Sequence, residues 1–144
     1  MVTRVSRTFA TRLALGWLAL NALQLGVWAL FAPRSFYDNF PGMGRAWVSI
    51  DGPFNEHFVR DFGALNLALL VVLVAAAIRL SPDLITVAAL SSLAWGIPHF
   101  VYHLVNTDNL DTSDIVMSLG GLAVSVLVAV GLLVSARGIA RANS

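Results

Sequence analysis

Four long apolar stretches, separated by short polar segments, dominate the hydrophobic pattern of the chain. They cover residues 13–31, 59–78, 84–105 and 115–135. A helix that crosses a bilayer needs about 20 mostly apolar residues. Each stretch is apolar nearly all round its helical circumference, as expected for helices that face lipid or lie wholly buried. The pattern predicts one all-α domain over residues 1–144, an integral membrane four-helix bundle.

The short links between the stretches predict an antiparallel arrangement. Residues 80–83 form a very short link, so the second and third spans are expected to pair as a helical hairpin. Residues 106–113 form a short acidic link, in which Asp111, Thr112 or Ser113 is expected to cap the fourth helix. The four helices are therefore expected to form an antiparallel bundle.

The first link, residues 33–58, is long and rich in aromatic residues. Aromatic side chains favour the membrane–water interface, so we expect this segment to form an outer loop that covers the helix ends like a lid. A short helix is expected within it, near Arg45, Ala46 and Trp47.

Charge placement predicts the orientation, because cytoplasmic segments of membrane proteins carry an excess of Arg and Lys. All nine basic residues are arginine. If the N-terminus is cytoplasmic, the cytoplasmic face carries a single acid, Asp83, and these arginines: Arg4, Arg7, Arg12, Arg79, Arg137 and Arg141. The outer face carries the other three arginines and seven acids. The sequence therefore predicts a multi-pass protein of the cell membrane, with both termini cytoplasmic and the lipid bilayer as its main partner.

Composition excludes several classes of function. Hydrophobic residues make up 58% of the chain and charged residues 12%, whereas soluble domains average about 45–50% and about 25%. The net charge of +1 gives no bulk attraction to nucleic acid, so no nucleic-acid partner is expected. The chain has no cysteine, which excludes disulfides, thiolate metal sites and iron–sulfur clusters held by this chain alone.

Three histidines provide the main chemical clue. His99 and His103 lie four residues apart in the third span, where ionisable side chains are costly and usually face protein or water. His57 and Asp61 have the same spacing at the start of the second span. Because the hairpin makes these two spans neighbours, we expect the four side chains to converge in one pocket beneath the outer loop. Further candidates are Glu56 as a ligand, Tyr102 as a cofactor contact, and Asn66 and Asp114 in the surrounding layer.

Three interpretations of this cluster remain open. In the first, the histidines and a carboxylate bind a divalent transition metal. The motif His-x-x-x-His is weak, since positions 100–102 lack the glutamate of His-Glu-x-x-His. In the second, a histidine is the axial ligand of a haem or the hydrogen-bond partner of a quinone. In the third, the side chains only hydrogen-bond one another and tie two helices together.

The leading functional hypothesis is a membrane protein whose outward-facing His/carboxylate pocket binds a metal, haem or small ligand, within a membrane redox system. The alternative is a non-catalytic structural or accessory subunit of a larger membrane complex, with the outer loop as its docking surface. A transporter is the third hypothesis. The expected protein partner is another copy of the chain or a different membrane protein. The pattern is compatible with an enzyme and with a binding protein.

Several local motifs resemble those of a known group of proteins. They are Phe40-Pro41-Gly42-Met43-Gly44-Arg45-x-Trp47, Gly52-Pro53-Phe54-Asn55-Glu56-His57, Asp61-x-Gly63 and Pro98-His99-x-x-Tyr102-His103. Together they resemble small four-span actinobacterial membrane proteins of unassigned function. In size and layout the chain is also similar to DoxX-like membrane proteins, a family that includes quinone-linked oxidoreductase subunits. The layout implies a four-helix membrane fold, and no catalytic residue is carried over from it.

Overall fold

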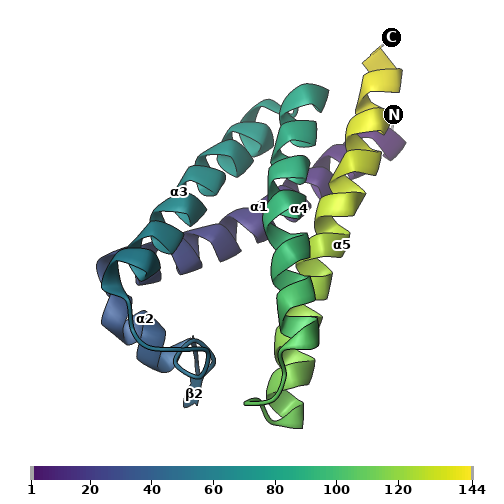
Figure 1. Ribbon diagram of the computed structural model, residues 1–144. Coiled ribbons are helices and arrows are strands. Elements are labelled where there is room, and N and C mark those ends of the chain that lie inside the picture. Colours follow the sequence, from purple (N-terminus) through teal and green to yellow (C-terminus); the bar gives the residue numbers. More distant parts are fainter. Residues whose placement is uncertain (1, 144) are drawn as a thin grey trace.

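The computed structural model describes residues 2–143, and the side chains of residues 7–141, as a mainly helical chain with one small hairpin (Figure 1). The elements are α1 (Val2–Phe31), α2 (Pro33–Asn39), β1 (Pro41–Gly42), β2 (Arg45–Ala46), α3 (Glu56–Arg79), α4 (Pro82–Val105) and α5 (Thr112–Asn143). Four of the described helices are long and apolar enough to cross a membrane. The predicted all-α fold with four spans is confirmed. α1 and α5 extend well beyond the predicted stretches, because their arginine-bearing ends stay helical.

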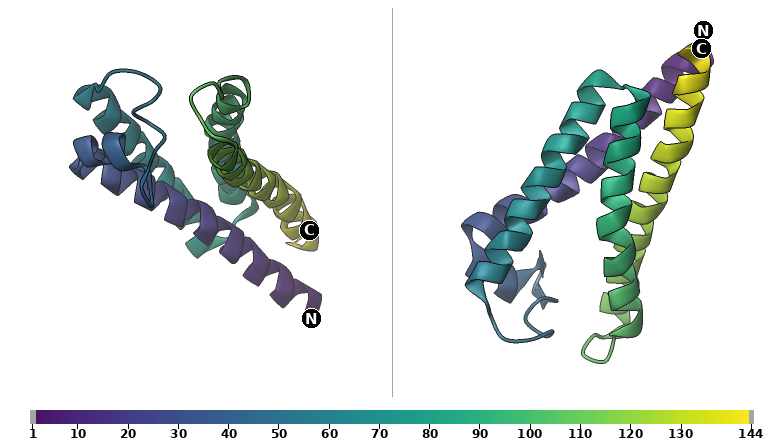
Figure 2. Two further views of the ribbon diagram at one scale, coloured as in Figure 1. Left: turned by 90° about the horizontal axis from the view of Figure 1, so that it is seen from below. Right: turned by 45° about the horizontal axis from the view of Figure 1, so that its top comes forward.

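The four long helices alternate in direction, so the molecule has two distinct ends (Figures 1 and 2). The terminal end holds both chain termini and the α3–α4 link, where Leu80 adopts a left-handed conformation and Ser81 caps α4. The loop end holds residues 40–55 with α2, and the link between α4 and α5. This alternation is the predicted antiparallel order.

The helices pack as two pairs, and this pairing differs from the prediction. α3 makes most of its contacts with α1, and α4 makes most of its contacts with α5. The two pairs lie together near the terminal end and diverge toward the loop end (Figures 1 and 2). The predicted antiparallel α3–α4 hairpin is present, but it makes fewer contacts than either pair; these contacts extend from the short link as far as Phe62 and Trp95.

Two glycines explain why α3 packs on α1. A Cβ added at Gly63 would lie 2.5 Å from the backbone nitrogen of Leu30 and 2.9 Å from the carbonyl oxygen of Gly26. Small residues at helix contacts in membranes allow backbones to approach this closely. The guanidinium of Arg60 also donates to the carbonyl of Leu30 at the same crossing. These contacts hold α1 and α3 together toward the loop end.

The main hydrophobic core lies where the two pairs meet, toward the terminal end. Its largest fully buried side chains are Leu15, Leu73, Ile85 and Leu132, one from each long helix. Close by, the hydroxyls of Thr11 and Ser135 share a hydrogen bond of 2.5 Å between α1 and α5. The guanidinium of Arg7 donates to the carbonyl of Gly138 on α5 over 3.1 Å. Apolar burial and polar contacts thus join the two pairs at this end.

The segment between α1 and α3 is more ordered than an open loop. Pro33 starts α2, where its fixed φ suits the first helical turn, and Phe36 of α2 is buried against α1 and α3. The short helix expected near Arg45 is wrong, because Arg45 and Ala46 form β2, paired antiparallel with β1. Positive φ angles at Gly42, Met43 and Gly44 turn the chain back between the two strands, which a helix cannot accommodate.

Candidate functional site

His99 and His103 lie side by side on one face of α4. The four-residue spacing places them one turn apart, and the centroids of their rings are 4.7 Å apart. Both side chains are half-buried. Among the described side chains, none forms a hydrogen bond to either imidazole, and each imidazole packs against two neighbouring rings. Their nitrogens are therefore available to a ligand.

The two imidazoles belong to a continuous row of rings that crosses from α2 to α4. The ring row, as we call it, consists of Phe36, Phe62, Trp95, His99, His103 and Tyr102, in order of contact. Centroids of successive rings are 4.0–5.9 Å apart. All but the shortest separation, between Trp95 and His99, lie within the range of about 4.5–7 Å for favourable aromatic pairs. The contact between Phe62 and Trp95 joins α3 to α4. The row holds the imidazoles against the side of α4 that faces α3.

Asn66 supports the ring row from α3. Its side chain is 2% exposed. Its Oδ1 accepts a hydrogen bond from Trp95 Nε1 over 3.4 Å, and its Nδ2 donates to the carbonyl of Phe62 over 2.9 Å. A buried amide in a membrane helix needs partners of this kind. Asn66 thereby fixes the indole that packs against His99, which agrees with its predicted place in the layer around the histidines.

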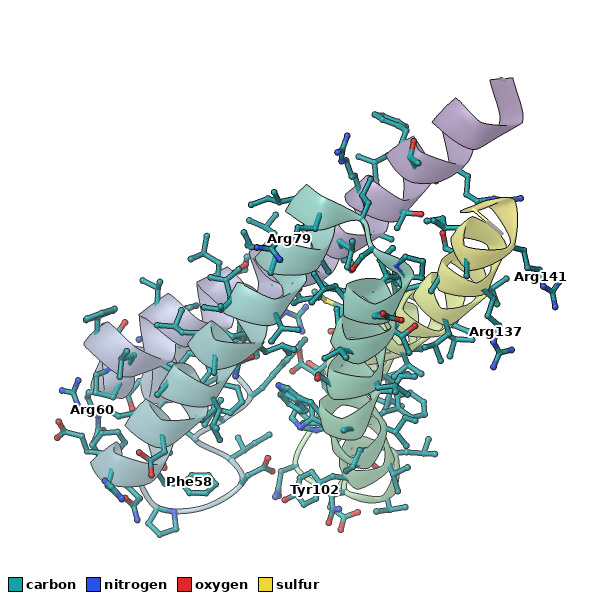
Figure 3. All side chains as sticks on the ribbon, turned by 90° about the horizontal axis from the view of Figure 1, so that it is seen from above. Phe58, Arg60, Arg79, Tyr102, Arg137 and Arg141 are labelled. Atoms are coloured by element: carbon teal, nitrogen blue, oxygen red, sulfur yellow. The ribbon has the colours of Figure 1, made fainter. Side chains whose placement is uncertain are left out.

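His57 and Asp61 lie apart from this row. Their side chains form an ion pair of 3.2 Å, with 88% of His57 and 59% of Asp61 exposed. Glu56 pairs with Arg60 over 2.8 Å and is also exposed. Both pairs follow the predicted i,i+4 spacing. They lie at the start of α3, close to Phe58, whereas Tyr102 marks the other helix pair (Figure 3).

The expected convergence of His57, Asp61, His99 and His103 is therefore not seen in the structure. Within the described part of the chain, no three histidine or carboxylate side chains lie close enough to hold one metal ion. The reason is the helix pairing: α3 diverges from α4 toward the loop end, where these residues lie (Figure 1). The candidate site reduces to His99 and His103 with their ring neighbours.

Arg45 bridges the two helix pairs at the loop end. From β2, its guanidinium forms an ion pair with Asp114 and donates to Ser113 Oγ over 3.1 Å. The side chains of Arg45 and Asp114 are only 26% and 17% exposed. Asp111 Oδ1 accepts from the backbone N–H of Asp114 over 2.8 Å, which confirms one of the predicted caps of the fourth helix. We call Arg45 with Asp114 and Ser113 the Arg45 clasp.

Two adjacent hollows lie between the segment 40–55 and the α4–α5 link. The larger, of about 350 Å³, is lined by Arg45, Trp47 and Asp114 among others. The smaller, of about 220 Å³, is lined by Tyr102 at the end of the ring row and by Asp51. The two hollows share three lining residues: Ile50, Asn109 and Leu110. The Tyr102 end of the ring row thus borders the hollow next to the one that the clasp lines.

Sequence reasoning missed Arg45 and Trp95 as parts of this region. Arg45 is the only basic residue between Arg34 and Arg60, and it faces an acidic link. The opposite charges of Arg45 and of the acidic link at residues 106–113 could have indicated that the two segments meet. Trp95 lies four residues before His99, one helical turn away, which is the spacing that brings two side chains on a helix into contact.

The chain has no match among protein-family models, curated proteins or solved structures. The resemblance to DoxX-like proteins stays a prediction.

Proposed function

We propose that the protein is a metal-binding protein of the cell membrane, in which His99 and His103 hold a divalent transition metal. The observation that carries the proposal is the pair of adjacent imidazoles whose nitrogens have no hydrogen-bond partner among the described side chains. Neutral imidazole suits zinc, copper and nickel.

The spacing of the two rings supports this proposal. With metal–nitrogen distances of about 2.0–2.1 Å, two imidazoles on one ion have ring centroids about 4.5 Å apart for a right angle at the metal and about 5.2 Å for a tetrahedral angle. The centroids of His99 and His103 are 4.7 Å apart, between these values. Metal binding requires each ring to turn one nitrogen toward a common ion.

Two protein ligands leave the coordination shell open. Structural zinc sites are closed by four protein ligands, whereas sites that bind exchangeable ligands keep a position for water or substrate. A two-histidine site therefore suits metal uptake, exchange or reaction with a small ligand more than structural support. Both imidazoles are half-buried, and Tyr102, which packs on His103, lines one of the loop-end hollows.

We also propose that the terminal end faces the cytoplasm. Arg79, Arg137 and Arg141 gather toward that end, whereas Arg60 lies near the other (Figure 3). Arg7 and Arg12 occupy the same end of α1 as the chain terminus. Cytoplasmic segments carry this excess of basic residues. The histidine pair then lies in the outer half of the membrane, in agreement with the predicted outward-facing pocket.

A metal titration tests the proposed function. Protein purified in mild detergent is equilibrated with excess Zn²⁺, Ni²⁺ or Cu²⁺, desalted and assayed for bound metal. We expect one ion per chain in the wild type and its loss in the double variant His99→Ala/His103→Ala. Binding only to the folded protein also stabilises it, by about 2.7 kcal/mol at a free metal concentration of 100 times Kd. The rise in thermal midpoint should be absent in the double variant.

His57→Ala is the matched control, because it removes an imidazole that lies outside the ring row. We expect it to bind metal as the wild type does. Equal metal content in the wild type and the double variant would refute the proposal. A Soret band in the purified wild type, lost in the double variant, would instead identify haem as the ligand.

A further inference from the structure

α1 buries one side in the molecule, and its opposite side carries large side chains that remain exposed. The buried residues include Leu15, Leu18 and Ala22. The exposed residues follow one another at alternating intervals of four and three positions, and we call them the Gln24 face: Leu13, Trp17, Leu20, Gln24, Val27 and Phe31. The five apolar members are 42–71% exposed. Since α1 runs along one edge of the molecule (Figure 2), the Gln24 face is open to a neighbour in the membrane.

The spacing of the Gln24 face is that of a helix that packs on a second helix. Alternating steps of four and three residues form the seam of a heptad repeat, along which two helices interlock their side chains. Helices in membranes mostly pack with the same left-handed geometry. A single polar residue within such a seam fixes the register and the number of helices. Gln24 occupies one of the seam positions.

Gln24 is the only glutamine of the chain, and its amide lies where lipid cannot satisfy it. It stands 12 residues after Arg12 and 10 before Arg34, the charged residues that flank the apolar stretch of α1. A bilayer core corresponds to about 20 residues, so Gln24 lies near its middle. Within the described part of the chain, the Gln24 side chain has no hydrogen-bond partner. An amide in hydrocarbon is costly without one, so the position calls for a partner outside the chain.

We propose that two copies of the chain pair through the Gln24 face, with the two Gln24 amides hydrogen-bonded to each other within the bilayer. Both copies have the same orientation in the membrane, so the twofold axis that relates them runs along the membrane normal and places each residue at one depth in both. A residue close to the axis therefore meets its own counterpart. An amide suits this position, because its oxygen accepts while its NH₂ group donates. The proposal does not depend on metal binding by the histidines.

Disulfide cross-linking in membranes tests which face forms the contact, because the chain has no cysteine of its own. Leu20→Cys and Val27→Cys place single thiols on either side of Gln24. Val71→Cys is the matched control, since Val71 is an exposed apolar residue within α3. Two cysteines form a disulfide only when their Cα atoms lie within about 7 Å. Under mild oxidation with iodine we expect dimers of Leu20→Cys and Val27→Cys and monomers of Val71→Cys. Equal cross-linking at all three positions, or none at Leu20 and Val27, would overturn the proposal.

The variant Gln24→Leu tests the two amides. It removes no hydrogen bond within the described part of the chain, so each copy should keep its fold. We expect the dissociation constant of the dimer to rise about tenfold, which corresponds to about 1.4 kcal/mol, a size typical of polar contacts between membrane helices. Energy transfer between labelled copies, measured at increasing lipid dilution, gives this constant.

Asn21→Leu is the control for this substitution, because the amide of Asn21 already donates to the carbonyl of Trp17 within α1. It should dimerise as the wild type does. An unchanged dissociation constant in Gln24→Leu would overturn the proposal. A wild-type protein that stays monomeric at every lipid dilution, or that pairs with a different membrane protein in place of a second copy, would overturn it as well.

Discussion

At the scale of single residues, Asn66 stands out because its polar side chain is almost completely buried. It is buried in the middle of α3, yet its amide has partners on both sides, the carbonyl of Phe62 and the indole N–H of Trp95. The interaction with Trp95 crosses from α3 to α4. Asn66 therefore couples the position of one helix pair to the orientation of the ring beside His99.

Replacement of Asn66 by alanine should destabilise the protein by roughly 0.6–1.7 kcal/mol, the range measured for polar contacts between membrane helices. The free energy of unfolding in mixed micelles measures this effect. Asn21→Ala is the control, because Asn21 also donates to the carbonyl four residues earlier but, among the described residues, has no hydrogen-bond partner on another helix. An Asn66→Ala variant as stable as Asn21→Ala would show that the contact with Trp95 contributes nothing.

The residue scale also shows which site features the sequence could predict. The His57–Asp61 and Glu56–Arg60 pairs and the Asp111 cap were predictable, because each depends only on spacing within one helix. The meeting of Arg45 with Asp114 was not, because it depends on how a hairpin is placed between two helix pairs.

At the scale of elements, the contact between α1 and α3 depends on Gly26 and Gly63. Apolar length alone predicted that both segments are helices, because a bilayer leaves few alternatives for a backbone that must satisfy its own hydrogen bonds. It could not predict that α3 packs on α1 in preference to α4. α3 packs closely on α1 because neither Gly26 nor Gly63 has a side chain where the two helices cross. A hydropathy profile gives no information about such a contact.

Gly63→Ala should separate α1 from α3. The added methyl would lie 2.5 Å from the backbone of Leu30, and a backbone cannot move aside as a flexible side chain can. Overpacking of this kind costs about 1–3 kcal/mol or more. Gly16→Ala is the control on α1, since a Cβ there meets nothing within 4 Å. Unfolding free energies in mixed micelles should fall for Gly63→Ala and stay close to the wild-type value for Gly16→Ala; equal values would contradict the assigned contact.

At the scale of the whole molecule, the two ends differ in how they are held. The terminal end combines the main hydrophobic core with the Thr11–Ser135 hydrogen bond. The loop end relies on the Arg45 clasp and the ring row. Relative movement of the two helix pairs is therefore expected to be small at the terminal end and larger at the loop end, where the candidate site lies.

The proposed orientation can be tested with introduced thiols, because the chain has no cysteine of its own. Met43 is 81% exposed at the loop end, and Asp83 is exposed at the terminal end. A membrane-impermeant maleimide applied to intact cells should label Met43→Cys at once and Asp83→Cys only after the cells are permeabilised. The reverse order of labelling would place the histidine pair on the cytoplasmic side.

The pairing of α1 with α3 and of α4 with α5 has a consequence for biosynthesis. During translation α1 is made before its main partner, and residues 56–79 must leave the ribosome before α1 and α3 can pair. The last two spans follow each other directly and can dock as soon as both are inserted. α1 is thus the helix that stays longest without its main partner during synthesis.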